Sequence, residues 1–83
     1  MNSPFVIEQA KGVANRDEIA KAATDEEKVQ ALYRLILQRR AQADEIDVGE
    51  KFLAAHSNTN SKLSPVERYA QVLLLSNELS YVD

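Results

Sequence analysis

The stretch that decides the fold is residues 24–37, TDEEKVQALYRLIL. It opens with a capping box, because the Thr24 hydroxyl can accept from the third helical amide while the Glu27 carboxylate reaches back to the amide of Thr24. Apolar residues then recur at the i, i+3, i+4, i+7 spacing that places them on one helix face. These residues are Val29, Leu32, Tyr33 and Ile36. The stretch therefore predicts an amphipathic helix over 25–39.

Two other helix starts carry capping signals. Residues 64–67, Ser-Pro-Val-Glu, repeat the capping box with proline at the first helical position, which favours a helix over 65–79. Near the beginning, Ser3 can cap a helix that starts at Pro4, and the apolar residues that follow extend this prediction over 4–22.

The rest of the chain completes an all-α pattern. Residues 15–18 form a weaker capping box, so the first helix could kink or restart near Asn15. A further helix is predicted over 44–56, and the polar run 57–61 reads as a loop. No window alternates with the period of two that a strand requires. We expect a small four-helix domain, orthogonal or bundle-like, that occupies 1–83.

Composition excludes several classes of function. The 83 residues carry a formal net charge of −3 and no Cys, which removes disulfides, thiolate zinc sites, iron–sulfur clusters and covalent haem attachment. An excess of acid over base argues against binding to nucleic acid. No segment approaches the ~20 apolar residues of a membrane span, so no membrane insertion is expected. We expect no cofactor.

The polar residues suggest no catalytic centre. His56 is the only histidine, and its simplest interpretation is an exposed side chain in the last turn of a helix. The paired carboxylates complement helix dipoles, and nothing places two of them in contrasting environments. These pairs are Glu26/Glu27, Asp44/Glu45 and Asp47/Glu50. An anion-binding patch could form from Arg34, Arg39 and Arg40, but no glycine-rich loop accompanies them. We expect a protein that is not an enzyme.

The segment 76–83, SNELSYVD, is less ordinary. Glu78 falls near a helix C-terminus, where the helix dipole disfavours an anion. Asn77 extends the apolar row of Leu73 and could face inward. One interpretation is structural: Asn77 or Glu78 bonds to a neighbouring helix end, or pairs with an arginine such as Arg34. The other is a binding role for the same polar residues.

Gly12 and Gly49 each interrupt a predicted helix, where glycine costs about 1 kcal/mol relative to alanine. Three interpretations are open at each position. The glycine is tolerated without a role, it allows two helices to approach closely, or it leaves the backbone open to a ligand.

Three segments carry a family resemblance. Residues 1–10, 31–37 and 63–83 resemble the last helical part of a family of large planctomycete proteins that pair cytochrome-c-like regions with domains of unknown function. The last segment is similar to the pattern A-Q-x-L-L-x-S-N-E-F-x-x-V-D. Leu79 stands where that pattern has an aromatic residue, and residues 39–43 replace its usual turn, which leaves the entry to the helix at 44 poorly capped.

The resemblance implies that the chain is the C-terminal part of a longer, exported or envelope-associated protein. It assigns no reaction and no catalytic residue. The leading hypothesis is a non-catalytic helical module that packs against the upstream domains of its parent, the isolated chain being a monomer or weakly self-associating. An alternative is that Arg34, Asn77 and Glu78 contribute to an enzyme or redox site shared with those domains. A third is an adaptor that binds a partner helix in a groove.

Overall fold

Helices account for most of the chain that the structure, a computed structural model, describes: residues 4–55 and 62–79, with side chains up to 77. In chain order they are α1 (Pro4–Ala14), α2 (Asp17–Ala20), α3 (Asp25–Ile36), α4 (Ala43–Ala55) and α5 (Pro65–Leu79). No strand occurs in the described residues, which confirms the all-α class. His56 and the loop predicted at 57–61 lie outside the described residues.

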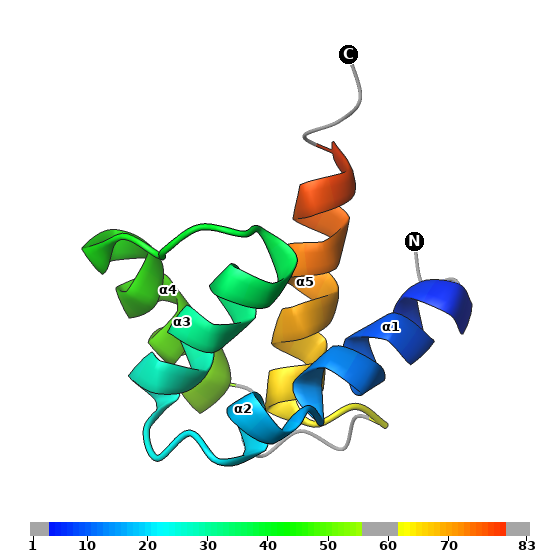
Figure 1. The fold of residues 1–83 in the computed structure, drawn as a ribbon, viewed down its shortest axis with the longest axis horizontal. Coiled ribbons are helices and arrows are strands. Elements are labelled where there is room, and N and C mark those ends of the chain that lie inside the picture. The colour runs from blue at the N-terminus through cyan, green and yellow to red at the C-terminus, as the bar shows by residue number, and fades with distance from the viewer. Residues whose placement is uncertain (1–3, 56–61, 80–83) are drawn as a thin grey trace.

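The last helix holds the others together. In Figure 1, α5 stands upright, with α1 on one side and α3 and α4 on the other. Its contacts agree, because α5 packs against α1, α3 and α4, while α2 packs mainly against α3. The lower end of α5 meets the C-terminal end of α1, and the other ends of the two helices diverge (Figure 1).

The predicted capping box forms completely at the start of α5 and only in part at the start of α3. In α5, the Ser64 hydroxyl accepts from the Glu67 amide at 3.1 Å, and the Ser64 amide donates to the Glu67 carboxylate at 2.8 Å. In α3, Thr24 accepts from the Glu27 amide at 3.1 Å. The Glu27 carboxylate, however, accepts from the amide of Ala23 at 3.2 Å, one residue earlier than the box predicts.

The predicted helix over 4–22 is split near Asn15, an outcome that the sequence left open, so the described residues form five helices in place of the four predicted. Arg16 takes an extended conformation, and α2 begins after it. The reason is the position of Ile19: at about 100° per residue, a continuous helix would place Ile19 about 180° away from Ala10. The break allows both to reach the core, where Ile19 is 1% exposed and Ala10 is fully buried.

Asn15 stabilises the break. Its side-chain amide donates to the carbonyl of Lys11 at 2.7 Å and to the carboxylate of Glu67 at 3.0 Å. The first contact gives the Lys11 carbonyl a second donor at the end of α1, because this carbonyl also accepts from the Asn15 backbone amide at 3.1 Å. The second ties the end of α1 to the beginning of α5.

The helix α3 ends three residues before its predicted end at 39. Leu37 is the C-cap, with its amide donating to the Tyr33 carbonyl at 2.8 Å. Gln38 follows with φ of 57°, in the left-handed region that usually selects glycine after a helix. The missing glycine is why the sequence suggested that the helix continues.

Gln38→Gly is expected to raise the free energy of unfolding by about 0.5–1 kcal/mol. The left-handed conformation costs an L-residue roughly 1–2 kcal/mol, and glycine removes that cost while adding freedom to the unfolded chain. Urea titration measures the change. The control is Gln9→Gly, in exposed helical backbone of α1, which should lower stability by up to about 1 kcal/mol. Equal losses in the two variants would contradict the proposed strain.

The helix α4 begins at Ala43 and is better capped than its sequence suggested. The amide of Gln42 donates to the Glu45 carboxylate at 2.8 Å. The amide of Ala41, just before it, donates to the side-chain oxygen of Gln30 at 3.0 Å, and the Gln30 amide returns a bond to the Ala41 carbonyl at 3.2 Å. The prediction of a poorly capped entry was therefore wrong, because side chains from α3 and α4 replace the missing turn.

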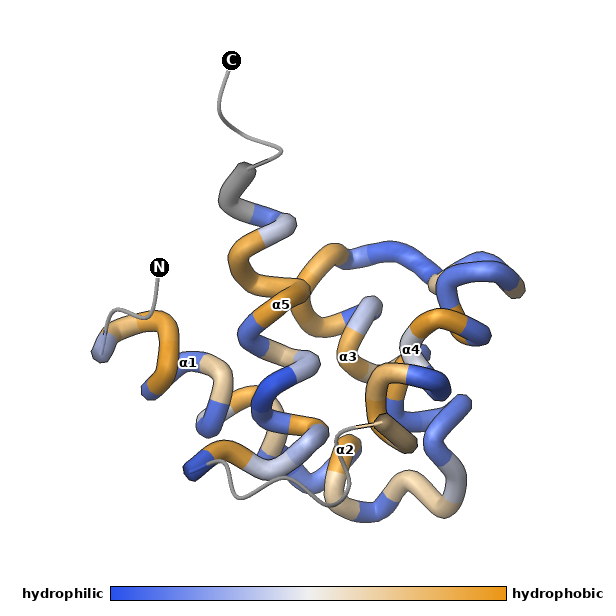
Figure 2. The backbone as a smooth tube through the Cα atoms, turned by 180° about the vertical axis from the view of Figure 1, so that it is seen from behind, coloured by the Kyte–Doolittle hydropathy of each residue, from blue (hydrophilic) through white to orange (hydrophobic). Residues whose placement is uncertain are grey.

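One hydrophobic cluster includes residues from all five helices. Figure 2 shows that the segments rich in apolar residues meet where the helices cross. The largest fully buried side chains are Ile19, Leu32 and Val29. No helix in the described ranges is long and apolar enough to cross a membrane.

Candidate functional site

The residues predicted to act together lie on α3 and α5. Arg34 is exposed on α3, at a hollow between α2 and α3, and Asn77 is half-buried near the end of α5. The ion pairs of the described residues do not include Arg34, and Asn77 takes part in an interaction of its own. The side chain of Glu78 lies outside the described residues. A contact between Glu78 and Arg34 therefore stays a prediction.

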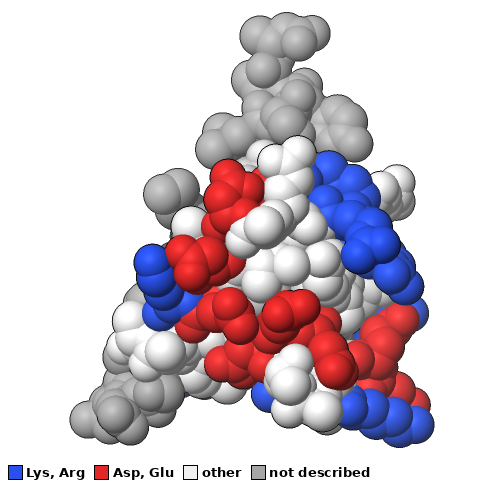
Figure 3. Space-filling view, turned by 90° about the vertical axis from the view of Figure 1, so that its left-hand side faces the viewer, with Lys and Arg blue, Asp and Glu red and all other residues white. Residues whose placement is uncertain are grey.

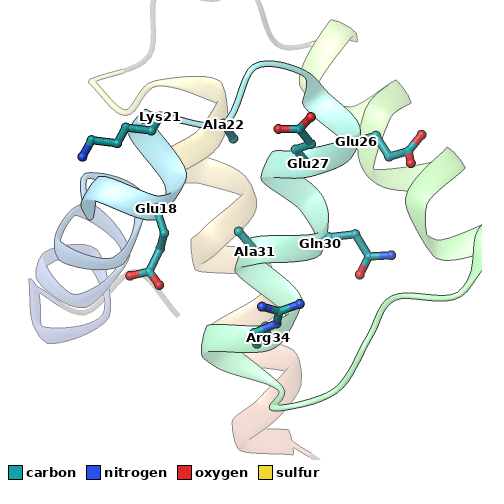
Figure 4. A pocket seen from close by; sticks show the side chains of 8 residues that line it. All are labelled: Glu18, Lys21, Ala22, Glu26, Glu27, Gln30, Ala31 and Arg34. Atoms are coloured by element: carbon teal, nitrogen blue, oxygen red, sulfur yellow. The ribbon is translucent and has the colours of Figure 1, made fainter.

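Arg34 belongs to the rim of a hollow between α2 and α3 (Figure 4). This hollow has a volume of about 390 Å³. Figure 4 shows Ala22 and Ala31 facing the space between the helices, with charged side chains around them and Lys21 pointing away. The full lining consists of Glu18, Lys21, Ala22, Glu26, Glu27, Gln30, Ala31 and Arg34.

Two carboxylates of this hollow, those of Glu18 and Glu27, form contacts within or next to their own helices. Glu18 pairs with Arg16 at 2.9 Å, and more than half of each side chain is exposed. Glu27 belongs to the capping arrangement of α3. General acid–base chemistry needs two carboxyl groups whose environments separate their pKa values, and these groups are all exposed to solvent. The hollow therefore provides no acid–base pair.

A cluster of polar contacts lies where α3 passes to α4. The Arg39 guanidinium binds both oxygens of the Glu45 carboxylate, at 2.8 and 2.7 Å, and lies 5.2 Å from the centre of the Tyr33 ring. Bidentate geometry and the aromatic face both favour a fixed guanidinium. Arg34, Arg39 and Arg40 were considered as an anion-binding patch. Because the Arg39 guanidinium already binds the Glu45 carboxylate, it does not contribute to such a patch.

The Arg39–Glu45 pair changes the pKa of the Glu45 carboxyl group. The hydrogen bond from Arg39 and then the one from the Gln42 amide lower the pKa of Glu45 from 4.5 to about 2. Both contacts stabilise the charged form of the carboxyl group. Sequence reasoning did not find this pair, because a separation of six residues across a turn corresponds to no helical spacing.

Glu45→Gln is expected to weaken the dependence of stability on pH in acid. A lowered folded-state pKa gives stability that is complete above the unfolded-state value near 4.5 and is lost as pH falls towards about 2. The variant should lack this loss, and at neutral pH it should be less stable by about 0.5–1 kcal/mol, the scale of an exposed ion pair. Urea unfolding over this pH range measures both effects.

Glu26→Gln is the matched control, because Glu26 is exposed and forms no ion pair among the described residues. Its stability should follow the wild-type pH profile. If Glu45→Gln also follows that profile, the Arg39 contact contributes nothing to the folded state.

Two buried tyrosines, Tyr33 and Tyr69, meet in the core next to the Arg39–Glu45 pair. Burial raises the pKa of the Tyr69 phenol above its ordinary value, and the neighbouring Tyr33 raises it further. The Tyr69 ring packs against Phe52 with centroids 5.3 Å apart. The sequence marked Tyr33 and Tyr69 only as apolar helix positions, and their meeting depends on how α3 and α5 pack.

The two glycines have different surroundings. A Cβ atom at Gly49 would lie 2.7 Å from a methyl of Val29 and 2.8 Å from the Tyr69 hydroxyl, so α4 approaches α3 and α5 at this point. A Cβ at Gly12 would have no neighbour within 4 Å. Close helix approach is therefore the explanation for Gly49, and Gly12 shows no packing reason for a glycine.

Three large apolar side chains are exposed among the described residues: Phe5 at 66%, Val48 at 63% and Val72 at 41%. Phe5 lies on α1 and Val72 on α5, the two helices whose ends diverge. Figure 2 shows apolar backbone along both diverging segments. Val48 lies on α4, so it is separate from these two in the fold.

The side of the molecule that carries α4 is charged instead. Figure 3 shows acidic side chains gathered across this face, with basic ones along its edges. The described residues contain no group of three His, Asp or Glu side chains placed to hold a metal ion. Two of the acidic side chains of α4, Asp44 and Glu45, lie in its first turn, where they complement the helix dipole.

Fold and surface together define a small all-α protein whose side chains are used mainly for capping and packing. Comparison of the sequence with protein-family models, curated proteins and solved structures finds no match. The resemblance to the planctomycete family therefore stays a prediction.

Proposed function

We propose that this chain is a non-catalytic helical module that packs against another part of a larger protein, of the planctomycete type that the sequence resembles. The contact uses apolar side chains of α1 and α5 that are exposed or half-buried and lie outside the core cluster. We call these residues, Phe5, Ile7, Val72 and Leu75, the outer apolar residues.

The observation that carries the proposal is the distribution of apolar residues around α5. Residues 72–75 are Val-Leu-Leu-Leu, and successive helical residues point about 100° apart, so one core cannot cover all four. Leu73 is buried and Leu74 packs against the core. Val72 is 41% exposed, and Leu75, one turn further, is half-buried outside the core cluster.

The beginning of α1 shows the same surplus. Phe5 is 66% exposed, and Ile7 is half-buried but does not pack against the core cluster. A phenylalanine is costly to leave in water, since burying its side chain contributes roughly 1.5–3 kcal/mol. A partner surface over α1 and α5 would gain this energy, whereas α2 and the hollow present charged side chains.

Binding of the dye 1-anilinonaphthalene-8-sulfonate tests whether the outer apolar residues form an accessible surface. The double variant F5Q/V72Q is expected to reduce the dye fluorescence of the folded chain, and any self-association seen by sedimentation, relative to wild type. Glutamine keeps a good helix propensity, so circular dichroism should be unchanged. The control is Val48→Gln, which removes an equally exposed side chain from α4. Equal dye binding by all three proteins would count against the surface.

Cross-linking in the longer polypeptide tests whether the surface is covered there. Benzoylphenylalanine placed at position 5 or 72 should cross-link to another segment of the same polypeptide, while the same group at position 48 should not. Mass spectrometry identifies the joined peptides. If positions 5 and 72 give no more product than position 48, packing against the parent protein is excluded as the role of this surface.

A further inference from the structure

We draw no further inference here: the strongest candidate, the hollow between α2 and α3 rimmed by Glu18, Glu27 and Arg34, has solvent-exposed charged side chains, two of them used in an ion pair and a helix cap, and nothing in the structure shows what would occupy it.

Discussion

Ile19→Ala is expected to lower the free energy of unfolding by about 2–5 kcal/mol, the usual cost of truncating a buried isoleucine to alanine. Ile19 is 1% exposed and is the only buried residue of α2. The one-turn helix has no capping side chain at Arg16, so its position depends on this anchor. Total stability for a chain of this length is about 4–12 kcal/mol, and the variant should therefore lose much of it.

Ile7→Ala provides the matched comparison, because it makes the same chemical change at a half-buried residue outside the core cluster. Its loss should be smaller than the loss at Ile19, since part of the Ile7 side chain stays in water in the folded state and the site lies outside the core cluster. Urea unfolding followed by circular dichroism measures both variants. Similar losses at the two positions would show that α2 is not anchored through Ile19.

Gly49→Ala is expected to destabilise the chain although alanine is the better helix former. The new methyl would lie 2.7 Å from Val29 and 2.8 Å from the Tyr69 hydroxyl, closer than folded proteins allow. Val29 is fully buried and β-branched, so it cannot easily rotate away. Overpacking costs about 1–3 kcal/mol and the gain in helix propensity returns about 1 kcal/mol, which leaves a net loss of up to about 2 kcal/mol.

Gly12→Ala should change stability in the opposite direction. The site is exposed and has no neighbour within 4 Å of the added methyl, so the variant should gain about 0.5–1 kcal/mol. A double-mutant cycle with Val29→Ala adds a second check, because shortening Val29 should relieve part of the cost of Gly49→Ala. A gain in stability from Gly49→Ala itself would contradict the close helix approach.

The helix starts were predictable because capping is local. Ser64 and Glu67 carry their partners within four residues, so the chain itself contains both halves of each hydrogen bond. The end of α3 was not predictable in this way. Gln38 adopts a left-handed conformation without being glycine, and the contacts of Arg39 with Glu45 and of Gln30 with Ala41 stabilise the turn from outside it.

The candidate site was harder to predict from the sequence than the fold. Arg34, Asn77 and Glu78 were grouped on their chemical character, and in the described residues Arg34 lies at a hollow beside α2, a position that the sequence did not indicate. Their grouping stays a prediction. The sequence pattern does not show which surface polar residues lie close together, because polar side chains can stand at almost any exposed position. The surplus of apolar residues on α5 was visible, since four consecutive apolar positions exceed what one helix face can hold.

By itself the sequence determined the all-α class, most helix starts and the residues with a strong preference for burial, because these follow from hydrogen bonds and periodicities within a few residues. The tertiary structure decided between alternatives that the sequence left open, in favour of the break near Asn15 and of close helix approach at Gly49, and it alone revealed the Arg39–Glu45 pair. Each depends on contacts between helices: Ile19 reaches the core only if the first helix breaks, and Gly49 is needed only because Val29 and Tyr69 pack against it. Local preferences place the helices along the chain, and packing between them sets where they bend and which side chains meet.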